Sequence, residues 1–126
     1  MNPVELQGLL DIARFVQDRP WQPFHPGIDC LPIYETLDGG PAAMLLRYQP
    51  GAHAPVHVHQ GYEHILVLSG SQTDERGHHP TGSLLIHPPG TEHHVRSEDG
   101  CVVLAIWERR VRFLSSDDAD TRDIGC

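Results

Sequence analysis

The residues best suited to chemistry are two closely spaced histidines, a glutamate shortly after them and a third histidine well beyond. His57 and His59 are separated by one residue, Glu63 comes four residues after His59, and His93 comes thirty residues after Glu63. Side chains two apart on a strand share a face. If this segment is a strand, His57 and His59 therefore project together, close enough to share one metal ion.

The carboxylate of Glu63 needs a partner, because it shares strand parity with the apolar Ile65 and Val67 and should face inward. Burying an unpaired carboxylate costs several kcal/mol, and a cation held by the histidines offsets that cost. A glycine-containing turn after His59 would return the chain beside the first strand, and a proline-glycine turn would deliver His93. Three imidazoles and one carboxylate favour a first-row transition metal such as iron, zinc, manganese or nickel over calcium or magnesium.

The other seven histidines are not assigned as ligands. We expect five of them to be solvated or hydrogen-bonded: His25, His53, His78, His79 and His94. His64 has the opposite strand parity to Glu63 and should point away from the metal. His87, on the strand before the proline turn, is left open.

Short apolar runs separated by proline, glycine or acidic turns indicate an all-β barrel or sandwich. The runs span residues 42–48, 63–70, 82–88 and 101–114. Within two of these runs successive residues are apolar, so both strand faces should be covered, one of them by a second sheet or a second subunit. The pattern predicts a homodimer. It also predicts a barrel interior that would favour a small, partly apolar molecule, built around Ile65, Val67, Leu84, Ile86 and Trp107.

The length of 126 residues suits one domain with a single core, which we place at residues 20–114. Residues 1–19 should form an N-terminal arm. Four of its apolar residues fit the stripe of a short helix: Leu6, Leu9, Leu10 and Ala13. Residues 115–126 are polar and acidic without periodicity, which predicts a mobile tail.

Composition excludes several classes of partner. A net charge of −8 with only nine lysines and arginines argues against nucleic acid and anionic lipid. No apolar window approaches the length of a membrane span, and the N-terminus lacks the layout of a signal peptide. Cys30, Cys101 and Cys126 form neither an even disulfide framework nor a C-x-x-C clip, so we expect reduced thiols. These features predict a soluble, cytoplasmic protein.

Two segments resemble the two motifs of the cupin superfamily. Residues 51–70 read G-x5-H-x-H-x3-E-x6-G, and residues 82–93 read G-x5-P-x-G-x2-H. The resemblance implies a small RmlC-like β-barrel of the jelly-roll type, with metal ligands at His57, His59, Glu63 and His93. The motif usually closes with asparagine, which is not a ligand, where this chain has Ser97.

Residues 20–107 are similar to the cupin domain of ChrR-type anti-sigma factors, a subgroup that also includes proteins resembling acetylacetone-cleaving dioxygenases. One implied function is a non-haem metal dioxygenase, with Fe(II) and with Glu63 as fourth ligand or catalytic base, that acts on a small diketone or a hydroxylated aromatic. The alternative is a zinc-binding sensory or ligand-binding module, in which Cys101 and Cys126 could report redox state, and a third reading is a metal that only stabilises the barrel. A sigma factor is not an expected partner, because the residues ahead of Trp21 are too few to encode the sigma-binding zinc domain of that family.

Overall fold

The protein is almost entirely β-structure, as the alternating turns and apolar runs predict. The computed structural model describes residues 2–113, so the predicted tail at 115–126 lies outside the described residues. The described elements are α1 (Ile12–Phe15), β1 (Gln22–His25), β2 (Ile28–Tyr34), β3 (Ala42–Tyr48), β4 (His53–Val58), β5 (Glu63–Asp74), β6 (Gly77–Pro80), β7 (Leu84–His87), β8 (Glu92–Arg96), β9 (Cys101–Trp107) and β10 (Arg112–Phe113).

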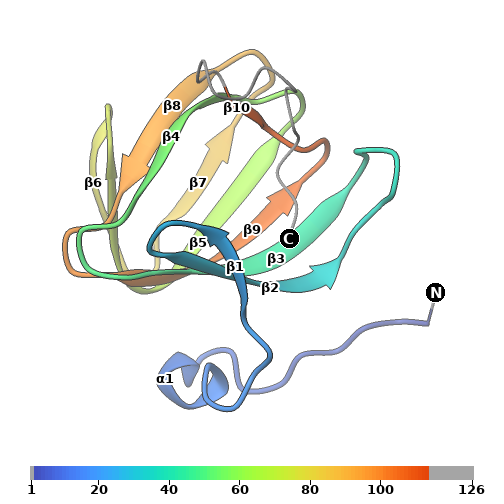
Figure 1. The fold of residues 1–126 in the computed structure, drawn as a ribbon, viewed down its shortest axis with the longest axis vertical. Coiled ribbons are helices and arrows are strands. Elements are labelled where there is room, and N and C mark those ends of the chain that lie inside the picture. Colours follow the sequence, from blue (N-terminus) through green and yellow to red (C-terminus); the bar gives the residue numbers. More distant parts are fainter. Residues whose placement is uncertain (1, 114–126) are drawn as a thin grey trace.

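The strands curl into two facing antiparallel sheets that together make a jelly-roll β-barrel (Figure 1). One sheet has the order β1-β2-β3-β9-β5-β7. The other has the order β10-β4-β8-β5-β6. Because β5 contributes to both sheets, it holds the two halves of the barrel together.

Strand β5 changes sheets at a local irregularity. Its first half pairs with β7 and β9, the register with β9 shifts between Val67 and Ser69, and the residues from Ser71 onward pair with β6. Gly70 lies at this junction with a φ of 69°. A Cβ on Gly70 would come within 2.0 Å of the carbonyl oxygen of Gly100. The close approach of two backbones therefore requires glycine here.

The barrel interior holds the main apolar core. Ile65, Val67 and Trp107 are buried, as predicted. Leu84 and Ile86, however, are 59% and 48% exposed, so the prediction that they line the interior is wrong. In the β5–β7 register Glu63 pairs with His87 and Ile65 with Leu85, which turns the alternate residues of β7 outward.

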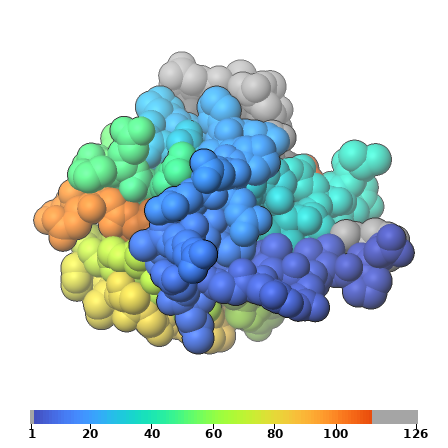
Figure 2. All heavy atoms as spheres, turned by 90° about the horizontal axis from the view of Figure 1, so that it is seen from below, coloured from blue at the N-terminus to red at the C-terminus, as the bar shows by residue number. Residues whose placement is uncertain are grey.

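The N-terminal arm covers part of the barrel's outer surface. Ile12 and Phe15 of α1 pack with Leu45 of β3 and Val102 of β9 in a second apolar cluster. Figure 2 shows the arm in blue, lying across this side of the molecule. The arm thus covers part of the outer apolar face of the barrel, which the sequence pattern predicted to be covered by a second sheet or a second subunit. The homodimer stays a prediction.

The predicted helix is present but short. It comprises four residues. Two residues of the apolar stripe that predicted it, Leu10 and Ala13, are exposed. Gly8 adopts a left-handed φ of 87° in the turn that precedes the helix. The helix therefore begins too late to include Leu6 and Leu9, which pack against the second cluster from outside it.

The cysteines differ in their environments. Cys101 is free and buried. Burial raises the pKa of its thiol to about 11, so it is not activated at neutral pH. Cys30 is fully buried in the main apolar core. Within residues 2–113 no helix is long and apolar enough to cross a membrane. The cytoplasmic location stays a prediction.

The requirement for glycine at the junction of β5 can be tested by comparing two glycines with positive φ. Gly70→Ala should lower the free energy of unfolding by about 3–5 kcal/mol, because strain and collision with Gly100 combine. Gly82→Ala, at φ 90° with open space around the added Cβ, should cost only the left-handed strain of about 1–2 kcal/mol. Urea unfolding of both variants measures the difference, and equal losses would show that no collision occurs.

Candidate metal centre

The fold brings the four predicted ligands together from both sheets. His57 on β4 lies directly opposite His93 on β8. Glu63, the first residue of β5, comes from the facing sheet, where its neighbours are His87 on β7 and Trp107 on β9. His59 lies just beyond β4, where its backbone exchanges hydrogen bonds with Gly90 and Thr91. Each ligand is therefore positioned by backbone pairing.

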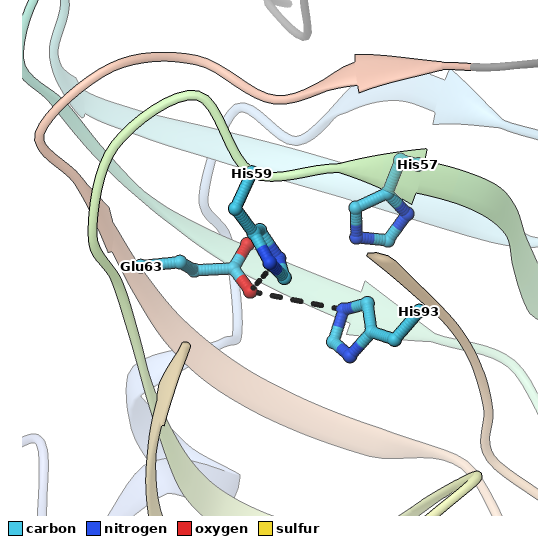
Figure 3. A group of neighbouring side chains, drawn as sticks. All are labelled: His57, His59, Glu63 and His93. Atoms are coloured by element: carbon cyan, nitrogen blue, oxygen red, sulfur yellow. Dashed lines mark ion pairs between the residues drawn. The ribbon is translucent and has the colours of Figure 1, made fainter. Parts of the chain in front are cut away.

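The four side chains point at one another inside the barrel (Figure 3). One potential ligand atom from each of His57, His59, Glu63 and His93 lies within 4.8 Å of every other. Ligands on opposite sides of an ion bound at about 2.1 Å are about 4.2 Å apart, so small shifts would let all four reach one ion. All four residues are at most 8% exposed. The cluster is a compact, water-shielded donor set.

Hydrogen bonds outside the cluster fix the tautomers of two of the imidazoles. The Nδ1 of His57 lies 2.8 Å from the carbonyl oxygen of Pro55, which can only accept, so Nδ1 carries the proton. The hydroxyl of Thr91 donates to the Pro88 carbonyl at 2.7 Å and accepts from Nδ1 of His59 at 2.8 Å. When the rings are neutral, the lone pair of each is thus on Nε2, where it can bind a metal.

Glu63 is held from three sides. The indole Nε1 of Trp107 donates to Oε2 at 2.5 Å, and Nδ1 of His87 donates to Oε1 at 3.0 Å. The Nε2 of His59 lies 2.9 Å from the same Oε1. Burial alone would raise the pKa of Glu63, but the contacts with His59 and His87 outweigh burial and lower it. Glu63 is therefore a carboxylate that carries negative charge in the barrel interior.

Burial also keeps two of the histidines neutral. It lowers the pKa of His57, and it lowers the pKa of His93 to about 3, where the neighbouring His57 adds to the effect. A neutral imidazole is the form that binds a metal. In the absence of a metal these two rings therefore already have the protonation state that a metal requires.

One buried atom shows that the donor set fits a cation. Nε2 of His59 has no hydrogen-bond partner in the described part of the chain. Its contact with Oε1 of Glu63 has the distance of an ion pair but does not meet the geometry of a hydrogen bond. If His59 is neutral with its hydrogen on Nδ1, its Nε2 lone pair faces a carboxylate oxygen at 2.9 Å, an arrangement that is repulsive unless a positive charge lies nearby. A metal ion held by three nitrogens and one oxygen would provide that charge, and this donor set suits a transition metal.

A small cavity adjoins the cluster. His57, Glu63 and His93 form part of its wall, and the other wall residues are mainly apolar. Among the described residues of the wall, Phe24 is partly buried and the others are buried. The space open to the centre of a water molecule is about 20 Å³, enough for about one water-sized molecule. The cavity therefore adjoins the donor set and could admit one small molecule beside a bound ion.

The remaining histidines are arranged largely as expected. His79 and His94 pair with Asp74 and Glu75 at 2.8 and 2.7 Å, and His53 is exposed. His64 is half-buried and stacks with Tyr62, outside the cluster.

Sequence reasoning missed two neighbours of the ligands. His87, which it left open, is buried, stacks on His59 with ring centroids 4.8 Å apart and hydrogen-bonds to Glu63. Trp107 was expected in the interior, but not as a donor to Glu63. Both contacts depend on cross-strand register, although the inward parity shared by His87 and Leu85 could have indicated that His87 faces the barrel.

Comparison with known proteins identifies the family. The model of the ChrR Cupin-like domain matches residues 10–108, so the chain belongs to this family of cupins. The resemblance drawn from the two motifs is confirmed. No curated protein matches the chain.

Solved structures support the same fold. The complex of Rhodobacter sphaeroides SigE with the anti-sigma ChrR contains a chain 29% identical, with a TM-score of 0.65 over 73% of this chain. The match covers half of that longer chain. An RmlC-like cupin from Ralstonia eutropha is 21% identical, with a TM-score of 0.69, and covers 87% of this chain and 74% of its own. Acetylacetone dioxygenase from Acinetobacter johnsonii is 13% identical, with a TM-score of 0.74, and covers 99% and 85%.

Ligand substitution tests the centre directly. His57→Ala and His93→Ala should each weaken metal binding by at least about 100-fold, because even changes to the partners of a ligand cost about 10- to 100-fold. The matched control is His64→Ala, which removes an imidazole next to Glu63 on the outer face and should retain the metal. Metal content per chain, measured by mass spectrometry after desalting, distinguishes the variants. Loss of metal in the His64 variant alone would contradict the assignment.

The lowered pKa values predict acid sensitivity of the metal-free protein. Between about pH 6.5, the usual pKa of histidine, and about pH 3 for His93, the unfolded chain binds protons that the folded chain does not. The free energy of unfolding should therefore fall as pH falls, by up to about 1.4 kcal/mol per pH unit for each such imidazole. The low pKa of Glu63 acts in the same direction below its ordinary value of 4.5.

Urea unfolding in the presence of a chelator, at several pH values from 7.5 to 4.5, measures this slope. His93→Asn should make it shallower, whereas His53→Asn, at an exposed position, should leave it unchanged. Identical slopes for wild type and the His93 variant would show that His93 is protonated in the folded protein.

Proposed function

We propose that this protein is a metal-dependent cupin oxygenase that acts on a small, partly apolar substrate such as a diketone or a hydroxylated aromatic. The observation that carries the proposal is the cavity walled by three of the four candidate ligands. A metal that only stabilised the barrel would need no space beside it, whereas catalytic sites keep a coordination position open. When bound, the metal would supply Lewis-acid and redox chemistry.

The residues of the chain have distinct tasks in this proposal. His57, His59 and His93 hold the metal, and burial shields the site from bulk solvent. The low pKa of Glu63 makes its carboxylate a weak base, which supports a role as fourth ligand rather than as the group that removes a proton from substrate. His87 and Trp107 orient that carboxylate through one hydrogen bond to each oxygen.

The size of the cavity limits how substrate can bind. About 20 Å³ accommodates a molecule the size of water or dioxygen, but not a diketone. Phe24 is the partly buried side chain in the wall and lies on β1, a short strand at the sheet edge that pairs with β2 through an irregular register. We infer that Phe24 moves when a larger molecule enters.

Oxygen consumption tests the proposal. The iron-loaded protein is placed in an oxygen electrode with a panel of small diketones and catechols, and at least one should give uptake well above background. His93→Ala should abolish this uptake and His64→Ala should preserve it. Background uptake across the panel in protein that retains its iron would contradict the oxygenase assignment.

The second candidate is a zinc-binding sensory module without catalysis. It is favoured by the 29% identity to a chain of the SigE–ChrR complex, which exceeds the 13% identity to acetylacetone dioxygenase. Tightly bound zinc in protein from the native host, together with a co-purifying partner protein and no oxygen uptake, would support this candidate. In either case we propose iron or zinc as the resident ion, with manganese and nickel as further options.

A further inference from the structure

A second group of metal-binding residue types lies behind the candidate ligands. Asp74, His87 and His93 each place one potential ligand atom within 4.8 Å of the others. His93 belongs to both groups, so the two share an imidazole. Asp74 is the last residue of β5, and sequence reasoning did not single it out.

His93 has an unused nitrogen that faces this aspartate. Its Nδ1 is buried and has no hydrogen-bond partner among residues 2–113. The nearest charged group is Oδ2 of Asp74, at 3.8 Å, while Nε2 on the other side of the ring lies 3.8 Å from Oε1 of Glu63. The imidazole of His93 therefore lies between the candidate metal centre and a second carboxylate.

The carboxylate of Asp74 is fixed in this orientation. Its other oxygen, Oδ1, accepts hydrogen bonds from Nε2 of His79 at 2.8 Å and from the backbone N–H of Arg76 at 2.9 Å. The side chain is only 2% exposed. Oδ1 accepts both of these hydrogen bonds, and Oδ2 is the oxygen that lies toward His93. His79, which the sequence analysis expected to be solvated or hydrogen-bonded, thus helps to hold the carboxylate of Asp74 in this orientation.

This arrangement matches a general feature of metal-binding histidines. The nitrogen that does not bind the metal usually donates its hydrogen to a carboxylate or carbonyl, which sets the tautomer and makes the ring a stronger ligand. For His57 the acceptor is the carbonyl oxygen of Pro55, and for His59 it is the hydroxyl oxygen of Thr91. Among the described residues, Asp74 is the charged acceptor that lies within 4 Å of Nδ1 of His93, and closing the 3.8 Å gap to hydrogen-bond length needs a shift of about 1 Å.

We propose that Asp74 is a positioning residue for the metal centre, which accepts the Nδ1 hydrogen of His93 and thereby presents Nε2 to the metal, with His79 holding Asp74 in place. The inference rests on the proposed metal centre, but not on catalysis. Asp74 contacts neither substrate nor metal in this role, and it acts only through His93.

The test compares two neighbouring carboxylates. Asp74→Asn should weaken zinc binding by about 10- to 100-fold. Glu75→Gln is the matched control, because Glu75 also contacts a histidine, His94, but on the exposed surface, and should leave the affinity unchanged. Competition with a chelating dye measures both dissociation constants, and urea unfolding of the metal-free variants separates lost affinity from lost stability.

A spectroscopic measurement reports on the hydrogen bond itself. In zinc-loaded wild-type protein, nitrogen-15 NMR should show the hydrogen of His93 on Nδ1, slow to exchange with water. This signal should move and exchange faster in Asp74→Asn but not in Glu75→Gln. The wild-type spectrum alone can overturn the inference, by showing zinc on Nδ1, if the Asp74 variant does not fold.

The outcomes separate the two proposals. Zinc binding as tight in Asp74→Asn as in Glu75→Gln would overturn the role of Asp74 and leave the metal centre standing. Wild-type protein that binds neither zinc nor iron would overturn both. Weakened binding with a displaced His93 signal, whether or not oxygen uptake is found, supports Asp74 as the positioning residue.

Discussion

The metal centre depends on a buried negative charge, the carboxylate of Glu63 in the barrel interior. An ionised carboxylate is stable in an apolar interior only if it is hydrogen-bonded and paired with positive charge. Trp107 and His87 satisfy the first need by donating to its two oxygens. His59 faces it with an unpartnered nitrogen, which is the arrangement that a bound cation would complete.

The barrel is built so that this charge and its histidines converge. β5 joins both sheets, and it begins at Glu63 in one of them and ends at Asp74 in the other. The same strand thus supplies a carboxylate on each side of His93, one in the cluster and one behind it. The β-bulge that makes the crossing possible relies on Gly70, whose backbone closely approaches Gly100. The passage of β5 between the two sheets at Gly70 therefore contributes both to the stability of the fold and to the geometry of the site.

Membership of the ChrR cupin-like family does not decide between catalysis and sensing, because one fold hosts many functions. The residues around the candidate metal centre say more about what it could bind. The buried, neutral histidines and the adjoining small cavity describe a centre that could bind a metal and one further small molecule. An oxygenase and a ligand sensor both need that property. They differ in whether the second molecule reacts, which depends on the metal and on which molecules can enter the cavity.

The sequence by itself was sufficient to predict the jelly-roll barrel and the convergence of His57, His59, Glu63 and His93. An all-β barrel or sandwich and the shared face of the ligands follow from local rules, namely strand parity and glycine- and proline-containing turns, whereas the jelly-roll type was implied by the resemblance to the cupin motifs. The resemblance to the cupin motifs pointed to the same residues. The sequence could also exclude His64 from the cluster, since adjacent residues on a strand face opposite ways.

Only the tertiary structure decided what depends on register between distant strands. The pairing of Glu63 with His87 and Trp107 joins residues 24 and 44 positions apart, and a shift of one residue would reverse which side chains face inward. For the same reason Leu84 and Ile86 lie outside the barrel. The position of Asp74 behind His93 likewise arises from the meeting of β5 and β8, which no local pattern encodes.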